Sequence, residues 1–124
     1  MGFMATIMFV DDDILALELM GKSASLLGYS PILCDSGLDS LELLKKVTPD
    51  IIFVDHSLAD TDGVWLIRQM RENPKSDGIG IIMLSAGHHG IDAEGALSAG
   101  ANKYLQKPLS LDILAETIHE FVRV

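Results

Sequence analysis

Three consecutive aspartates, Asp11, Asp12 and Asp13, directly follow an apolar run near the start of the chain. Two carboxylates about 5 Å apart repel one another by roughly 3 kcal/mol at an effective dielectric constant of ~20. The carboxylates must therefore spread into water or share a cation, and Mg²⁺ is a hard cation that prefers oxygen ligands. By itself, the triplet is better explained as the start of a helix, because acidic side chains stabilise the positive end of a helix.

Three more polar residues stand where later apolar runs end: Asp55, Ser85 and Lys107. Together with the aspartate triplet they make a set suited to a phosphoryl group. A cation between the carboxylates relieves their repulsion, and a lysine ammonium and a serine hydroxyl can each contact a phosphate oxygen. A carboxylate can itself be the nucleophile and form an acyl phosphate. The set therefore predicts a site for phosphoryl chemistry, provided that the fold brings these residues together.

The apolar runs that precede these residues alternate with longer amphipathic segments. Four of the five runs are almost continuously apolar, as is typical of strands buried on both faces of a parallel sheet. The alternation predicts an α/β fold, a doubly wound (βα)5 three-layer sandwich with right-handed crossovers. The predicted strands span residues 5–10, 31–34, 51–54, 79–84 and 103–106.

Such sheets bind ligands outside the carboxyl ends of their strands, at the point where the strand order reverses. The polar residues at the ends of the first, third, fourth and fifth predicted strands are therefore expected to meet at one edge of the sheet. The second strand ends in Asp35 and Ser36, which are typical of a turn and a helix cap. We expect that strand to lie on the outer side, away from the site.

Apolar residues at helical spacing give the amphipathic segments a predicted buried face. The last helix is the clearest, and Ser110 is its expected N-cap. The fourth helix is the weakest, because its apolar stripe is mostly alanine and its segment is rich in glycine. The predicted stripes are Leu17, Met20, Ala24 and Leu27; Leu66, Ile67 and Met70; Ala93, Ala96 and Leu97; and Leu111, Leu114, Ala115, Ile118, Phe121 and Val122.

The composition predicts one domain over residues 1–124, since a chain of 124 residues with 48% hydrophobic content can build one core. The net charge of −9 argues against nucleic acid or an anionic membrane as direct partner, because both need a basic surface. The single cysteine, Cys34, excludes an internal disulfide and is expected to be buried in a strand. No apolar run approaches the ~20 residues of a membrane span and the start lacks a signal peptide, so we expect a cytoplasmic protein.

Four motifs in order make the chemistry more specific: "FVDDD", "IIFVDHSLADTDG", "IIMLSAG" and "GANKYLQKP". Together they resemble the receiver domain of two-component response regulators, and the resemblance covers essentially the whole chain. The spacing agrees with that family, since 30 residues separate Asp55 from Ser85 and 22 separate Ser85 from Lys107. The resemblance implies a flavodoxin-like parallel sheet with the strand order 2-1-3-4-5.

The resemblance also implies a role for each acidic residue of the site. Asp55 would accept a phosphoryl group, and Mg²⁺ would be the cofactor. Asp11, Asp12 and Asp55 would hold the metal through their carboxylates, and Ser57 would hold it through its backbone carbonyl. Asp13 is instead expected to belong to the start of the first helix.

The remaining motif residues are expected to contact the phosphoryl group or to respond to it. By resemblance, Ser85 and Lys107 would contact the phosphate, so that Asp55, Lys107 and Ser85 form the reacting set. Ser85 and Tyr104 would be the switch pair that changes the surface of the domain. Such a domain is not a conventional enzyme, because its own chemistry is self-phosphorylation and slow self-hydrolysis.

The partners follow from the same resemblance. A sensor histidine kinase or a histidine phosphotransfer protein would donate the phosphoryl group. A downstream output domain or protein would read the altered surface, and a phosphorylation-dependent homodimer is a further state that the resemblance allows. The chain would thus be a phosphorylation-controlled signalling module, either on its own or as part of a longer protein.

The chain departs from the family pattern in two places within these motifs. Leu58 and Ala59 stand where the family often has Met-Pro, so the loop after Asp55 lacks a proline that would make it rigid. Ser85 replaces the more common threonine and lacks its methyl group. Two other features fit the family: the Asp62-Gly63 turn, where glycine tolerates a backbone that other residues avoid, and Pro108, which is expected to follow a cis peptide bond.

Two alternatives remain open at this point. The stretch "VDDDIL" also resembles the first motif of haloacid-dehalogenase-like phosphatases, in which Asp11 would be the nucleophile and Asp13 the acid. That reading leaves Asp55 unexplained, and it needs an acidic metal motif for which only helical residues remain after Lys107. The second alternative is a degenerate receiver that acts as a scaffold, but such a protein should lack one of the key residues.

Several residues outside the predicted site can each be interpreted in two ways. His56 either modulates access to Asp55 or is an exposed residue at the end of a strand. Trp65 lies one position off the apolar stripe of its helix, and packing explains it better than a contact surface does. His88 and His89 are adjacent and have no third ligand nearby in the sequence, which favours a solvated loop over a transition-metal site.

Overall fold

Strands and helices alternate along the chain, as the apolar runs predict. The computed structural model describes residues 5–86 and 90–122, without the side chains of residues 90–92. In order, the elements are β1 (Thr6–Val10), α1 (Ile14–Leu26), β2 (Ser30–Cys34), α2 (Gly37–Leu43), β3 (Ile51–Asp55), α3 (Gly63–Glu72), a 3-10 turn (Pro74–Ser76), β4 (Gly80–Ser85), α4 (Gly90–Ala99), β5 (Lys103–Gln106) and α5 (Leu111–Phe121).

The strands form one parallel sheet in the order β2-β1-β3-β4-β5. Strand β1 pairs on both sides, with Met8 opposite Ile32 of β2 and Ile52 of β3. This strand order is the flavodoxin-like one, and it confirms the predicted doubly wound α/β fold. It also confirms that β2 is an outer strand. Asp55 and Ser85 are the last residues of their strands, one residue beyond the predicted strand ends.

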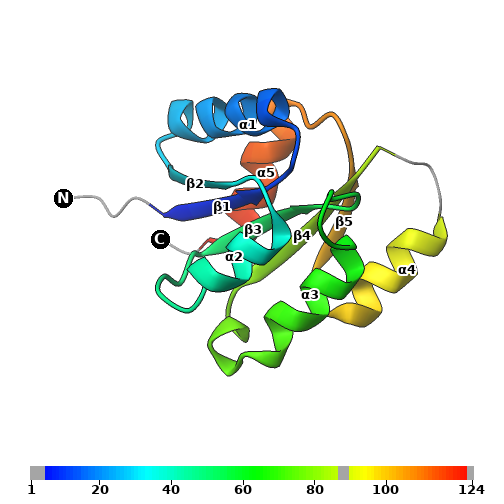
Figure 1. Ribbon diagram of the computed structural model, residues 1–124. Helices are drawn as coiled ribbons and strands as arrows, with labels where there is room; N and C mark the ends of the chain where they lie inside the picture. The colour runs from blue at the N-terminus through cyan, green and yellow to red at the C-terminus, as the bar shows by residue number, and fades with distance from the viewer. Residues whose placement is uncertain (1–4, 87–89, 123–124) are drawn as a thin grey trace.

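Helices cover both faces of the sheet, so the molecule has three layers (Figure 1). Helices α1 and α5 lie on one face, over a cluster that includes Ile7, Phe9, Phe53 and Ile118. The rings of Phe9 and Phe53 stack there with centroids 5.2 Å apart. Helices α2, α3 and α4 lie on the other face, over the second hydrophobic cluster. The strands are buried on both faces, which explains why most of them are continuously apolar in sequence.

The predicted helix faces are largely those that the structure buries, with two corrections. Leu97 of α4 is 51% exposed, because this helix packs on Ala96 and Ala99 and turns Leu97 outward. Leu111 is 46% exposed, because it begins α5 and lies in the first turn. The buried face of α5 instead includes Thr117, whose hydroxyl donates a hydrogen bond to the carbonyl of Ile113 at 2.7 Å.

Polar residues cap the helices where the sequence predicts them. Asp13 caps α1, Ser36 caps α2 and Ser110 caps α5, each by accepting a hydrogen bond from a backbone N–H of the first turn. Asp62 caps α3 in the same way through the N–H of Val64. These caps end the loops at the carboxyl edge of the sheet and so fix where each loop enters its helix.

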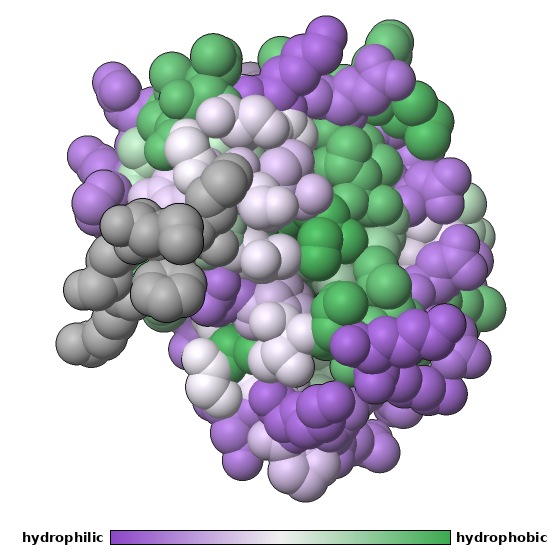
Figure 2. Space-filling view, turned by 90° about the vertical axis from the view of Figure 1, so that its left-hand side faces the viewer, coloured by the Kyte–Doolittle hydropathy of each residue, from purple (hydrophilic) through white to green (hydrophobic). Residues whose placement is uncertain are grey.

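Figure 2 shows the side of the molecule that lies at the left of Figure 1, where β1 begins. A band of hydrophobic residues crosses this face between hydrophilic ones (Figure 2). A groove between α1 and β2 is lined in part by Gly21, Leu26, Pro31 and Leu33. Within the described ranges, the helices are too short or too polar to cross a membrane.

Candidate functional site

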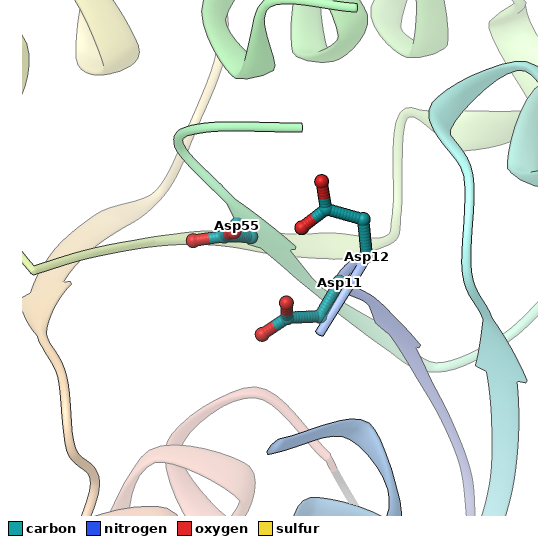
Figure 3. Close-up of side chains that lie close together, drawn as sticks. All are labelled: Asp11, Asp12 and Asp55. Atoms are coloured by element: carbon teal, nitrogen blue, oxygen red, sulfur yellow. The ribbon is translucent and has the colours of Figure 1, made fainter. Parts of the chain in front are cut away.

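The carboxylates of Asp11, Asp12 and Asp55 gather at the carboxyl edge of the sheet (Figure 3). Asp11 and Asp12 follow β1, and Asp55 ends the neighbouring parallel strand β3, so pairing of the two strands brings them together. Their ligand oxygens all lie within 4.8 Å of one another. Asp11 is 0% exposed and Asp55 is 8% exposed, whereas Asp12 lies at the surface. Three hard oxygen donors at this separation fit a cation such as Mg²⁺.

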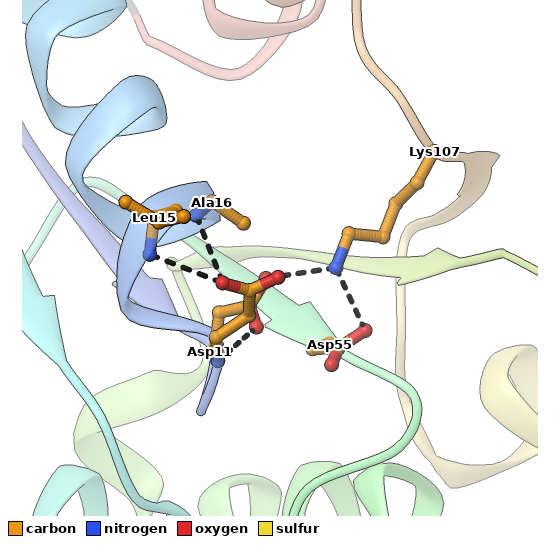
Figure 4. Close-up of polar contacts among 6 residues, drawn as sticks. Asp11, Leu15, Ala16, Asp55 and Lys107 are labelled. Carbon is orange, nitrogen blue, oxygen red and sulfur yellow. Dashed lines mark hydrogen bonds and ion pairs between the residues drawn. The ribbon is translucent and has the colours of Figure 1, made fainter.

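The ammonium group of Lys107 reaches the same cluster from the end of β5 (Figure 4). Its Nζ lies 2.8 Å from Asp11 Oδ2 and 3.3 Å from Asp55 Oδ1. The backbone N–H of Lys107 donates to the carbonyl of Ser85 at 2.8 Å, which fixes the residue beside the end of β4. The Lys107–Pro108 peptide bond is cis, as the resemblance implies. The lysine thus bridges two of the three carboxylates.

Burial and charge shift the pKa values of two groups in the cluster. Burial raises the pKa of Asp55 above its usual value, and the charge of Asp11 adds to this effect, while the nearby Lys107 ammonium opposes it. For Lys107, burial acts to lower the pKa, but the hydrogen bond to Asp11 and the charges of Asp55 and Asp11 raise it overall. Lys107 therefore stays charged at neutral pH and supplies a fixed positive charge beside Asp55.

Asp13 has a different environment from its two neighbours. Its Oδ1 accepts hydrogen bonds from the N–H groups of Leu15 at 3.0 Å and Ala16 at 3.3 Å, where it caps α1 (Figure 4). Its own N–H donates to Asp11 Oδ1 at 2.9 Å. The prediction that Asp13 belongs to the helix start is confirmed. In the phosphatase alternative Asp13 would be the acid, and its carboxylate is instead occupied with the helix.

Ser85 and Tyr104, the predicted switch pair, lie at different places in the sheet. Ser85 is buried at the end of β4 and is opposite Gln106 in the register of β4 and β5. Tyr104 lies within β5, and its ring packs against the cluster beneath α3 and α4. Its hydroxyl oxygen is buried and lacks a hydrogen-bond partner in the part of the chain that the structure describes. The structure thus brings Ser85 to the site edge and places Tyr104 in the sheet toward α3 and α4.

The loop between β3 and α3 begins with His56 and the exposed Ser57. Ser57 forms an isolated antiparallel bridge with Asp62, and Gly63 N–H donates to the carbonyl of His56 at 3.1 Å. The expected reason for Gly63 is wrong, because positive φ angles in the described residues occur only at Gly28 and Gly100. Glycine is needed for space instead: a Cβ there would lie 2.7 Å from the backbone oxygen of Asp55.

One residue of this loop has a role that the sequence did not predict. The carboxylate of Asp60 accepts hydrogen bonds from the N–H groups of Gly37 at 3.0 Å and Leu38 at 2.9 Å. These residues begin α2 and stand more than 20 positions earlier in the chain. The sequence shows an aspartate in a loop that lacks proline. A local pattern of this kind does not predict a hydrogen bond to residues so far away in the chain. His88, His89 and Gly87 lie outside the described residues.

Comparison with known proteins identifies the family. The model for the response regulator receiver domain matches residues 7–119. The response regulator MprA of Mycobacterium leprae is 33% identical over 117 residues, which cover 94% of this chain and 50% of that protein. The chain therefore spans about half the length of the curated relatives it matches.

Two solved structures are similar in fold and carry informative descriptions. The receiver domain of the sensor histidine kinase PA1611 from Pseudomonas aeruginosa, with a magnesium ion coordinated in its active site cleft, has a TM-score of 0.88 and 26% identity. The match covers 96% of this chain and 98% of that one. The receiver domain of Ssk1 from Saccharomyces cerevisiae, co-crystallised with the histidine phosphotransfer protein Ypd1, matches with a TM-score of 0.86 and 25% identity. That match covers 95% of this chain and 88% of the other.

The acidic cluster at the carboxyl edge, the lysine that bridges it and these matches agree with one another. The cluster residues and Lys107 lie within residues 7–119, which the family model matches, and the fold is that of the two solved receiver domains. Domains of this family serve in two-component signalling and are not conventional enzymes. The chain belongs to the response regulator receiver domain family.

Proposed function

We propose that this domain accepts a phosphoryl group on Asp55 in the presence of Mg²⁺ and changes its surface in response. The observation that carries the proposal is the contact of the Lys107 ammonium with both Asp11 and Asp55, inside a cluster of three carboxylates. A carboxylate oxygen of Asp55 attacks phosphorus, the bond from phosphorus to the donor nitrogen breaks, and an acyl phosphate forms while the donor imidazole regains a proton. Water later hydrolyses the acyl phosphate slowly.

Asp55 is a better phosphoryl acceptor than Asp11, because its carboxylate is more accessible and Asp11 already uses both of its oxygens in contacts within the domain. Asp11 is 0% exposed, and its two oxygens already contact the N–H of Asp13 and the ammonium of Lys107. Asp55, at the end of β3, keeps 8% of its surface exposed and lies close to both Lys107 and the exposed Asp12. Lys107 then lies where it can neutralise charge on the incoming phosphoryl group.

The residues present fit a bound Mg²⁺. Asp11, Asp12 and Asp55 supply carboxylate oxygens, and Ser57 would add its backbone carbonyl. When bound, the metal would neutralise the carboxylates and the transferred phosphoryl group. The PA1611 receiver domain, which is similar in fold, holds a magnesium ion in its active site cleft. This supports the same metal here.

The phosphoryl donor is proposed to be a sensor histidine kinase or a histidine phosphotransfer protein. The Ssk1 receiver domain was crystallised with such a phosphotransfer protein. In this chain α1 starts beside the acidic cluster and exposes Leu15 (78%) and Leu19 (67%), which offer apolar contact area on that helix. Apolar area beside a reacting group suits a transient protein partner. A cytoplasmic location belongs to the same proposal.

The response is proposed to pass through Ser85 and Tyr104 to an output domain or protein, with a phosphorylation-dependent homodimer as a further state. Ser85 lies at the site edge, and its backbone carbonyl accepts from Lys107. Tyr104 lies one strand farther out, with its ring against the cluster beneath α3 and α4. A change at Ser85 can therefore reach the surface of α4 and β5 through this ring.

Intact-mass analysis with acetyl phosphate and Mg²⁺ tests the proposal. We expect the mass of one phosphoryl group to be added, the gain to be lost in Asp55→Asn, and chelation of Mg²⁺ to prevent it. Asp50→Asn is the matched control, because Asp50 lies at the opposite edge of the sheet, where its carboxylate accepts from Thr6 N–H. Phosphorylation that persists in Asp55→Asn or falls on Asp11 would favour the phosphatase alternative. An unmodified wild type would favour the scaffold.

A further inference from the structure

The loop between β3 and α3 is attached to helix α2 through Asp60. Each oxygen of the Asp60 carboxylate takes one backbone N–H at the start of α2: Oδ1 that of Gly37 at 3.0 Å and Oδ2 that of Leu38 at 2.9 Å. These contacts lower the pKa of Asp60, with the Leu38 N–H as the largest cause, although burial acts in the opposite direction. The carboxylate therefore remains charged and bound to both N–H groups at neutral pH.

The neighbouring Thr61 packs against the start of α2 and so adds to the contact between the loop and this helix. Its Oγ1 is buried and has no hydrogen-bond partner among the described residues. A Cβ on Gly37 would overlap this oxygen, so the start of α2 lies directly against the loop. A buried hydroxyl without a partner is unfavourable, and it persists here because the loop is held in place by other contacts.

The base of the loop is also fixed. Ser57 bridges to Asp62, and Gly63 N–H donates to His56 O, which joins the two ends of the loop to one another. A loop held at its base and at Asp60 has little freedom left. Leu58 and Ala59 lie between these two attachments. Neither position holds a proline, which would restrict the backbone there.

We infer that Asp60 is a positioning residue, which holds the loop of residues 57–62 on α2 so that the backbone carbonyl of Ser57 faces the carboxylates of Asp12 and Asp55. The inference rests on the proposed function, in which Ser57 and the acidic cluster bind Mg²⁺. Residues that orient a metal ligand without touching the metal commonly change metal affinity by about 10- to 100-fold when mutated. Asp60 holds the loop in place of the missing proline.

The variant Asp60→Ala removes both hydrogen bonds and leaves every group of the acidic cluster unchanged. We expect the Mg²⁺ dissociation constant, measured by calorimetry, to rise about tenfold. In phosphorylation by acetyl phosphate, the half-saturating Mg²⁺ concentration should rise by about the same factor. The rate at saturating Mg²⁺ should stay within about twofold of wild type, because Asp55 and Lys107 are intact.

The matched control is Asp50→Ala, which removes a carboxylate that accepts a backbone N–H from Thr6 at 2.7 Å, at the other edge of the sheet. It should leave both Mg²⁺ values unchanged. Asp60→Asn keeps one carbonyl oxygen as an acceptor, and we expect its Mg²⁺ affinity to fall between wild type and Asp60→Ala. If Asp60→Ala does not fold, Asp60→Asn decides the question, with a rise of about threefold expected in its Mg²⁺ dissociation constant.

Unchanged Mg²⁺ affinity in the folded Asp60 variants, or an equal loss in Asp50→Ala, would overturn the role of Asp60. That result differs from a failure of the proposed function, in which wild type itself would neither bind Mg²⁺ nor gain a phosphoryl group. A rise in half-saturating Mg²⁺ confined to the Asp60 variants supports the inference.

Discussion

The Lys107 ammonium lies 2.8 Å from Asp11 Oδ2, although 96 positions separate the two residues in the sequence. Asp11 is 0% exposed, and this contact supplies the opposite charge that its carboxylate needs. The pair joins the start of the chain to the end of β5 and holds a positive charge beside Asp55. It therefore serves the stability of the domain as well as its chemistry.

Lys107→Ala is expected to destabilise the domain by about 3 kcal/mol in the absence of Mg²⁺, because it leaves a buried carboxylate without a partner. Urea denaturation measures this loss, and added Mg²⁺ should reduce it by supplying another positive charge. The control is Lys103→Ala, which removes an exposed ion pair with Glu120 at 2.6 Å and should cost less than about 1 kcal/mol. Equal losses in the two variants would contradict this reading of the Lys107–Asp11 pair.

Gly63→Ala is expected to cost about 2 kcal/mol of unfolding free energy and to slow phosphorylation. Its Cβ would lie 2.7 Å from Asp55 O and 2.9 Å from His56 O, which are backbone atoms that can move only with the end of β3. Gly78→Ala is the control, because its Cβ would meet nothing within 4 Å and should change stability by less than about 0.5 kcal/mol. If Gly63→Ala behaves like Gly78→Ala, the close approach does not constrain the site.

Tyr104→Phe is expected to leave stability unchanged or to raise it by up to about 1 kcal/mol, since the buried hydroxyl has no partner in the described chain. Thermal unfolding without a phosphoryl group measures this effect. A clear loss of stability would show that the hydroxyl makes a favourable contact in the unphosphorylated domain. The response to beryllofluoride, an acyl phosphate mimic, then tests separately whether the hydroxyl takes part in the switch.

Helix α4 is expected to exchange its amide hydrogens faster than α5 does. It is held on the sheet by the small side chains of Ala96 and Ala99, whereas α5 buries Leu114 and Ile118. Hydrogen exchange of residues 93–99 against residues 114–121, with and without beryllofluoride, measures the difference. Equal protection of the two helices, with no response to the mimic, would remove α4 from the proposed switch.

Cys34 is expected to resist alkylation until the pH is strongly basic. Burial, followed by the charges of Asp39 and Asp35, raises the pKa of its thiol from 9.0 to about 11. At pH 8 the folded protein should therefore hold about a hundredfold less thiolate than the unfolded chain. The stability that this thiol contributes is fully present below its unfolded pKa and is lost as the pH rises through about 11. Iodoacetamide labelling in buffer and in urea measures the ratio, and similar rates would contradict it.

The sequence by itself determined the order of the strands and helices and most of the site. Continuous apolar runs can be buried on both faces in a covered parallel sheet, and each end of the five predicted strands lies within one residue of the observed end. Polar residues at strand ends must then share one edge, which is where Asp11, Asp12, Asp55 and Lys107 meet. Caps such as Asp13 and Ser110 were predictable because their contacts are local.

Only the tertiary structure decided which helix residues are buried at the margins and how the loops are held. Leu97 is exposed because the packing angle of α4 selects Ala96 and Ala99, and helical spacing alone does not fix that angle. Gly63 is required by the nearness of Asp55 O, whereas the sequence suggested an unusual backbone angle. The contact of Asp60 with Gly37 joins residues 23 positions apart, and it depends on how α2 and the β3–α3 loop pack at one edge of the sheet. Contacts of this kind arise from the geometry of the whole fold, so a local sequence pattern does not contain them.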